Sequence, residues 1–296
     1  MTKIITHSGV AHLDDFLSTC LILHKDPDID EIIRTDEVSE QDLKDKNIWK
    51  VDIGVTHDPD ILAFDHHQET DGECSLSLIL KYWDVWDSAI EVYSWLHPAV
   101  KIDAFGLDQF LTKHKMSYDT FFKLDSFIEK SFIELFQRRK KISNEKHRLL
   151  FIIMKQIGKQ FFTGITSYYE ILNNIESQLN IASINKSGIE EIHENGIPVI
   201  LYLTKKPQYS SHLFNIFRKF KSKMFPNHHG GWISVFTYDR PKNSLYLKRN
   251  GSRSQIDFSQ INSMEKTIFA HDKGFVAIVE NMPEEELYAY IQQAIT

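Results

Sequence analysis

Short runs of β-branched and apolar residues alternate with amphipathic segments over the first third of the chain. The runs are typical of strands and lie at residues 3–6, 30–35, 48–51 and 61–64. Helical patterns separate or follow them at 14–24, 39–46 and 75–82. This alternation predicts a parallel sheet that has right-handed crossovers and is flanked by helices.

The pattern changes twice along the rest of the chain. From residue 118 to about 179 the apolar spacing is mostly helical, and residues 180–196 are then punctuated by Asn, Ser and Gly. Four strand-like runs follow at 197–202, 231–236, 244–247 and 275–279, before a terminal helix that begins near Pro283. We therefore predict an α/β protein with a parallel-sheet domain over 1–185 and a smaller mixed α/β domain over 186–296.

Composition narrows the class of protein. The chain has 296 residues, of which 42% are hydrophobic and 25% charged, as in ordinary globular proteins that bury a sizeable core. Its two cysteines, Cys20 and Cys74, cannot make a disulfide framework, which favours a reducing compartment. The first residues have no signal-peptide layout, and apolar runs such as 149–154 are too short to cross a bilayer. These features predict a cytoplasmic protein without a membrane partner.

The charge is unevenly distributed. The formal net charge is −7, yet residues 205–253 contain eleven Lys or Arg and one acid. That segment carries +10 and the remainder −17, so an acidic part of the protein can face a basic part.

Candidate chemistry lies at the ends of three strand-like runs, each of which is followed by His or Asp. In open α/β sheets the binding crevice lies at the carboxyl ends of the strands. Imidazoles and carboxylates without a thiolate suit a divalent ion such as manganese better than a structural zinc. Two ions that share a carboxylate would use all the donors, and two ions can activate a water and stabilise the departing oxygen of a phosphoryl centre. The donors are His7, His12, Asp14, Asp52, His66 and Asp103.

Each donor also has an ordinary structural explanation. A single histidine such as His7 is usually a surface or helix-cap residue, and Asp14 can be only a first-turn helix acid. Asp52 and Asp103 can be turn residues, and residues 65–67 can form a polar loop. The joint placement of these groups at strand ends, in one half of the chain, is what favours a metal site.

Several motifs resemble those of a known family. Residues 7–14 read His-Ser-Gly-Val-Ala-His-Leu-Asp, 51–54 read Val-Asp-Ile-Gly, and 64–68 read Phe-Asp-His-His-Gln. The series resembles the DHH phosphoesterase superfamily and, within it, the MYG1 family, which has His-Asn-Gly-x-x-His-x-Asp and Tyr-Asp-His-His-Gln. Weaker similarities run through Ile-Asp-Ala-Phe-Gly at 102–106 and Ile-Phe-Ala-His-Asp-Lys-Gly-Phe at 268–275.

The resemblance implies a manganese-dependent phosphoesterase, since some MYG1 relatives are 3′–5′ RNA exonucleases. The six donors would hold two ions, with Asp52 bridging them. Asp65 would hold the ring of His66, because ligand histidines generally need such a partner. His67 would face the scissile phosphate as electrophile or acid, and no side-chain nucleophile is needed.

The same resemblance points to substrate contacts in the C-terminal domain. Arg249 is the candidate phosphate clamp, since a guanidinium pairs with phosphate through two hydrogen bonds, and His271 is its candidate partner. Many relatives have a run of glycines that lets phosphates approach the backbone; here Gly274 is followed by Phe-Val-Ala-Ile. Arg249 and Arg253 are explained equally well as solvated charges at a strand edge.

Two further stretches each allow two interpretations. The basic residues of 218–223, with an aromatic neighbour, suit either a groove that tracks phosphates or a solvated helix face. The His-His-Gly-Gly sequence at 228–231 suits either a phosphate-contacting loop or a flexible turn.

The sequence thus predicts a hydrolase of phosphodiesters in RNA or a short oligonucleotide, with two Mn²⁺ ions, Mg²⁺ being the alternative. One rival is a small-molecule phosphoesterase, either a pyrophosphatase or a cyclic-dinucleotide phosphodiesterase. Another is a metal-binding or nucleic-acid-binding protein without catalysis. The basic segment 205–253 favours the polymer, and the sequence leaves an oligomer possible.

Overall fold

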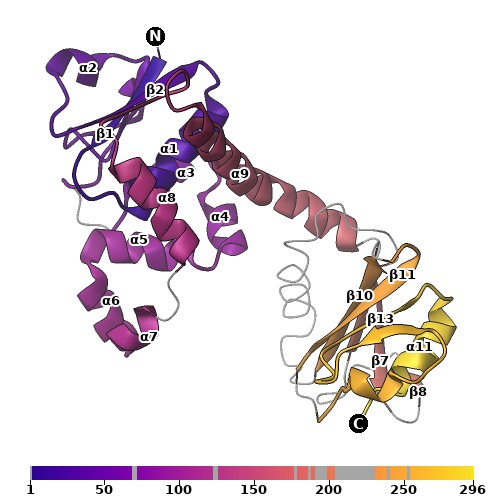
Figure 1. Cartoon of the computed structure of the whole chain (residues 1–296). Coiled ribbons are helices and arrows are strands. Elements are labelled where there is room, and N and C mark those ends of the chain that lie inside the picture. Colours follow the sequence, from indigo (N-terminus) through magenta and orange to yellow (C-terminus); the bar gives the residue numbers. More distant parts are fainter. Residues whose placement is uncertain are drawn as a thin grey trace. The chain divides into compact units, whose positions relative to one another are not determined.

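The computed structural model of the protein describes residues 2–68, 72–122, 126–176, 179–185, 188–190, 199–203, 231–238, 241–251 and 254–296. The chain divides into two compact units, Met1–Ser167 and Tyr168–Thr296 (Figure 1). The division falls inside the long helix α9 (Arg148–Glu176). The boundary predicted between residues 185 and 186 from composition stays a prediction.

The N-terminal unit is built on a six-stranded sheet with the order β4-β5-β3-β1-β2-β6. Its centre is parallel, because β1 pairs in parallel with β2 and β3, and β3 with β5. The edge strands β4 and β6 are antiparallel to their neighbours. The strands are β1 (Thr2–His7), β2 (Ile29–Thr35), β3 (Ile48–Val51), β4 (His57–Asp58), β5 (Ala63–Phe64) and β6 (Lys141–Ser143).

Successive apolar side chains of the central strands point to opposite faces of the sheet, which explains why helices cover it. Ile4 of β1 belongs to the main core, whereas its neighbour Ile5 faces a small cluster with Ile48 on the opposite face. Helices α1, α3 and α9 supply most of the main core, and Gly158 of α9 lies directly against the backbone of Cys20 in α1. The helices of this unit are α1 (Leu13–Lys25), α2 (Glu40–Lys44), η1 (Pro59–Ile61), α3 (Ser75–Tyr82), α4 (Trp86–Val92), α5 (Leu96–Phe105), α6 (Leu107–His114), α7 (Tyr118–Phe122) and α8 (Phe127–Gln137).

The C-terminal unit is a seven-stranded sheet with the order β12-β13-β11-β10-β9-β7-β8. It is antiparallel except for the β9–β10 pair. Helix α11 and the short helix η2 contribute to one core with strands β10, β11 and β13. The elements are β7 (Leu179–Asn185), β8 (Gly188–Glu190), β9 (Val199–Leu203), β10 (Trp232–Tyr238), β11 (Ser244–Asn250), η2 (Phe258–Ile261), β12 (Thr267–Ala270), β13 (Val276–Glu280) and α11 (Glu284–Gln292).

The predicted α/β class is confirmed, with a sheet flanked by helices in the first unit and a separate sheet in the second. The first sheet is mixed where we expected it to be parallel, because two short edge strands join it in the opposite direction. Arg253, the basic stretch 218–223 and the histidines at 228 and 229 lie outside the described residues.

Candidate metal centre

Three parallel strands bring their polar ends to one edge of the first sheet. Strand β1 ends at His7, Asp52 follows β3, and Asp65 and His66 follow β5. Because β1, β3 and β5 are adjacent and run in the same direction, these residues leave the sheet side by side. The strand-end prediction therefore matches the geometry.

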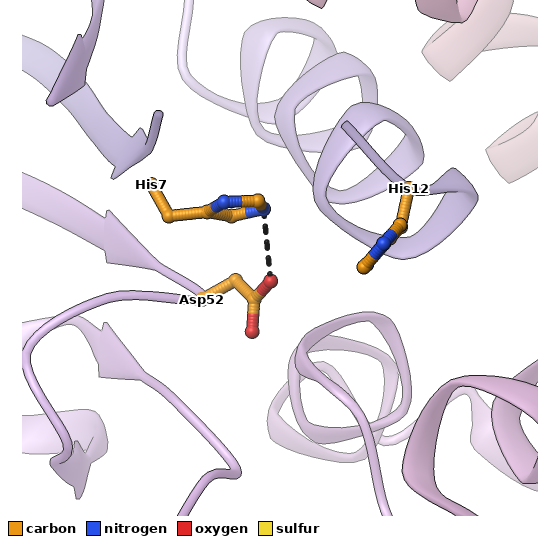
Figure 2. A group of neighbouring side chains, drawn as sticks. All are labelled: His7, His12 and Asp52. Atoms are coloured by element: carbon orange, nitrogen blue, oxygen red, sulfur yellow. Dashed lines mark ion pairs between the residues drawn. The ribbon is translucent and has the colours of Figure 1, made fainter. Parts of the chain in front are cut away.

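Asp52 lies at the centre of the first group of donors. Its Oδ2 lies 3.3 Å from Nε2 of His7, and its Oδ1 lies 3.3 Å from Nε2 of His66 and 3.6 Å from Nδ1 of His67. The dashed line in Figure 2 marks the ion pair with His7. Its backbone has φ = +55°, a left-handed conformation that Asp tolerates better than most residues. The hydroxyl of Ser75, at the start of α3, donates to Asp52 Oδ1 over 3.3 Å. Strand end, backbone conformation and helix start thus fix this carboxylate.

Helices supply the second group. His12 and Asp14 lie at the start of α1, and Asp103 lies in α5. Nδ1 of His12 is 3.5 Å from Asp103 Oδ1, and Nε2 of His66 is 3.3 Å from Asp103 Oδ2. His66 therefore joins the helix-borne donors to the group around Asp52.

Ligand atoms in this region form three overlapping sets, within each of which all atoms lie within 4.8 Å of one another. Asp52 and His12 each belong to two sets. The sets are His7, His12 and Asp52; Asp52, His66 and His67; and His12, Asp14 and Asp103. All six donors predicted from the sequence are therefore brought together, while their role as ligands stays a prediction.

Buried polar atoms test whether these residues fit a metal. Asp14 is only 4% exposed, and within the residues that the structure describes neither of its carboxylate oxygens has a hydrogen-bond partner. Nε2 of His7 is likewise buried without a hydrogen bond, although carboxylates lie 3.3 Å away. Burying a carboxylate costs free energy unless it forms an ion pair or hydrogen bonds or coordinates a metal, so the donor set fits a divalent cation.

The carboxylates perturb one another in the direction expected of a crowded anionic site. Burial, reinforced by the charges of Asp103, Asp52 and Asp15, holds the pKa of Asp14 well above its usual value. Burial and the charge of Asp52 also raise the pKa of Asp103. A cation would relieve this repulsion.

The neighbouring carboxylates favour the charged form of the histidines, whereas they disfavour the charged form of Asp14 and Asp103. Contact with Asp15 raises the pKa of His7, and burial opposes that rise without cancelling it. At His66, burial is outweighed by Asp52 and Asp103, so the pKa is raised. At Asp52, burial is outweighed by His66 and His7, so the pKa is lowered.

Asp65 contacts a different histidine from the one that the resemblance implied. Its Oδ1 lies 2.7 Å from Nδ1 of His67 and accepts a hydrogen bond from the His67 N–H, while its Oδ2 accepts from the N–H of Val55. Asp65 therefore orients the ring of His67, where we expected it to hold His66.

Sequence reasoning assigned no role at this site to Asp15 and Arg34. Asp15 is fully buried, and its Oδ2 lies 3.3 Å from Nε2 of His7 and 3.8 Å from the guanidinium of Arg34. Its Oδ1 accepts from the N–H groups of His12 and Phe16, which caps α1. Asp15 thus links the start of α1 to His7. Its position in a first turn signals only a cap, so the contact with His7 has no sequence signal.

The predicted substrate contacts lie in the second unit and meet around the turn that joins β12 to β13. The guanidinium of Arg249 donates to the carbonyls of Ile256 (2.8 Å) and Lys273 (3.4 Å), so part of its donor set is used internally. The N–H of Gly274 donates to the His271 carbonyl over 2.6 Å. Gly274 has φ = +64°, and a Cβ there would lie 1.8 Å from Asp257 Oδ1. Gly274 is therefore required sterically, whatever its role toward a substrate.

Comparison with known proteins agrees with the motifs. A family model labelled MYG1_exonuc, described as an uncharacterised protein family (UPF0160), matches residues 3–77, which contain all three strand ends. A MYG1 protein of Dictyostelium discoideum is 26% identical over 318 residues, covering 92% of this chain and 91% of that protein. The chain is thus similar to the MYG1 family, over the motif-bearing residues by the family model and over most of its length by this relative. The resemblance predicted from the motifs is confirmed, and it supports a metal-dependent nuclease or phosphoesterase in general.

The structure also shows whether any described helix could span a membrane. Within the residues that the structure describes, none of the helices combines the length and the apolar character that a membrane span requires.

Proposed function

We propose that this chain is a manganese-dependent phosphodiester hydrolase that acts as a 3′–5′ exonuclease on RNA or short oligonucleotides. The observation that carries the proposal is the buried Asp14 carboxylate, which lacks hydrogen-bond partners among clustered imidazoles and carboxylates. The exonuclease label of the matching family model supports the reaction class.

Six side chains would hold two ions, and Asp52, which belongs to two of the three overlapping donor sets, would contribute a carboxylate at their centre. When bound, the ions supply Lewis acidity that activates a water and neutralises charge on the phosphate. Imidazole and carboxylate donors without thiolate suit Mn²⁺, and Mg²⁺ is the alternative. The ligands would be His7, His12, Asp14, Asp52, His66 and Asp103.

The chain itself prepares the proton donor. Asp65 is buried and lies 2.7 Å from Nδ1 of His67, which favours a proton on that nitrogen and fixes the ring. The side chain of His67 is 58% exposed, in contrast to the buried carboxylates beside it. We assign His67 to contact the scissile phosphate and to hold a proton for the departing oxygen, with Asp65 as its positioning residue.

Nucleotide release from single-stranded RNA in the presence of Mn²⁺ tests the proposal. Asp52→Asn should abolish release, because the variant loses the carboxylate shared by two donor sets. Asp60→Asn is the matched control, since this exposed acid in the same unit belongs to none of the three donor sets. Equal, negligible release by the wild type and Asp52→Asn would overturn the proposal. Hydrolysis of pyrophosphate or a cyclic dinucleotide, with RNA left intact, would favour the small-molecule alternative.

A further inference from the structure

Three rings cluster around the turn that joins β12 to β13 in the second unit. Phe269, in β12, and Phe275, in the turn before β13, are 46% and 39% exposed, which is unusual for phenylalanine. The ring centroid of His271 lies 4.2 Å from that of Phe275 and 6.3 Å from that of Phe269. We call Phe269, His271 and Phe275 the ring cluster.

Hydrogen bonds fix the backbone of the turn and one ring nitrogen of His271. His271 N–H donates to Val276 O, Lys273 N–H donates to Nδ1 of His271 over 3.1 Å, and Phe258 N–H donates to Gly274 O. A flat ligand that packs on the rings would therefore lose little conformational entropy in ordering the turn that carries His271 and Phe275.

Cations lie next to the ring cluster. Lys273 is exposed at the tip of the turn, and Arg249 donates its backbone N–H to the Phe275 carbonyl over 2.9 Å. The guanidinium of Arg249 reaches the same turn at the Lys273 carbonyl. The turn also carries an exposed acid, Asp272. Exposed rings beside cations are the combination that binds single-stranded nucleic acid, through base stacking and phosphate contacts.

The geometry of the strand argues against a protein partner added to the sheet. Strand β12 lies at the sheet edge, but it has four residues and an irregular register with β13 between Thr267 and Phe269. Short, irregular edge strands are poor templates for pairing with another chain.

We propose that the ring cluster is a nucleobase-stacking site for the single-stranded substrate, with Phe269 and Phe275 as the stacking residues. The inference rests on the proposed function, which supplies the nucleic acid as ligand. The sequence singled out His271 only as the partner of a phosphate clamp, so the two phenylalanines add a binding element of a different kind.

Fluorescence anisotropy of the full chain in EDTA tests this site without hydrolysis. The probes are a labelled single-stranded RNA hexamer and an abasic hexamer that has the same phosphates. The Phe269→Ala, Phe275→Ala double variant should bind the RNA about tenfold more weakly or worse, since each stacked base contributes substantially. Its affinity for the abasic hexamer should equal that of the wild type.

Matched variants separate stacking from charge and from folding. Phe127→Ala, at an 84% exposed phenylalanine of α8, should leave RNA binding unchanged. Phe275→Trp keeps a stacking ring and should retain binding. Loss of the rings should leave the salt slope unchanged, whereas Lys273→Gln should reduce it by roughly one phosphate contact.

Two results would overturn the stacking site: unchanged RNA affinity of the double variant, or equal weakening toward RNA and the abasic probe. A change of oligomeric state in the double variant, with RNA binding intact, would instead make this face an interface between copies of the chain. A wild type that stacks RNA but releases no nucleotide with Mn²⁺ would contradict the proposed function and leave this site standing.

Discussion

Replacing Asp15 by Asn tests whether a buried charge pair supports the metal centre. Asp15 is fully buried, and its Oδ2 lies 3.8 Å from the Arg34 guanidinium, which is itself 3% exposed. The variant keeps Oδ1 as the cap for the His12 and Phe16 N–H groups but turns an amide N–H₂ toward Arg34 and His7. Geometry is preserved while the charge is lost.

The expected cost follows from the distance. A charge pair at about 4 Å is worth about 4 kcal/mol at an effective dielectric constant of about 20. Arg34 keeps its hydrogen bonds to the carbonyls of Gln137 and Gly9, so we expect a loss of about 2–4 kcal/mol in the free energy of unfolding. For a unit of this size, that lowers Tm by roughly 5–15 °C. Since Asp15 also contacts His7, affinity for Mn²⁺ should fall about 10- to 100-fold.

Thermal melting of the metal-free protein, followed by tryptophan fluorescence, measures the first effect, because four of the five tryptophans lie in the N-terminal unit. Adding Arg34→Met should recover part of the loss, because removing both charges is cheaper than removing one. Asp60→Asn serves as the surface control. If Asp15→Asn melts with the control and binds Mn²⁺ normally, or if the double variant loses the sum of both effects, the charge-pair argument is refuted.

Two further predictions concern packing and protonation. Gly158→Ala should destabilise the N-terminal unit by about 1–3 kcal/mol or more in chemical denaturation, because the new Cβ would lie 1.9 Å from the Cys20 carbonyl oxygen. Thr166→Ala, at an exposed position of the same helix, is the control and should change stability by less than about 0.5 kcal/mol. A Gly158→Ala protein as stable as Thr166→Ala would contradict the close approach of the two helices. Metal-free protein should lose stability from pH 6 to pH 8, because the pKa of His7 and of His66 is raised in the fold and their stabilising contribution is lost as they deprotonate. Mn²⁺ should therefore raise Tm more at pH 8 than at pH 6 in paired melts with EDTA, and a metal-free Tm that is flat or rising over this window would contradict the assignment.

The strand-end donors could be predicted because local pattern and topology agree there. Apolar runs before His7, Asp52 and His66 predict strands, and parallel neighbours necessarily gather their carboxyl ends. Asp103 differs, since it reaches the site from helix α5 and does not follow one of these strand-like runs.

Other features depend on tertiary contacts that leave no local pattern. Strand β6 has three residues within a stretch whose spacing is mostly helical, and it exists because Ile142 pairs with β2 and is fully buried. The partner of Asp65 is set by the loop after β5, which places Nδ1 of His67 nearest the carboxylate. The sequence allowed two interpretations of Arg249, a phosphate clamp or a solvated charge. Its guanidinium instead donates to the carbonyls of Ile256 and Lys273, which lie outside its own strand.

Metal content of the purified protein tests the central claim most directly. After equilibrium dialysis against Mn²⁺, elemental analysis should find about two ions per wild-type chain and a clear loss in Asp52→Asn, with Asp60→Asn unchanged. Retention of no ion by the wild type, or equal content in wild type and Asp52→Asn, would contradict a metal centre built on these strand ends.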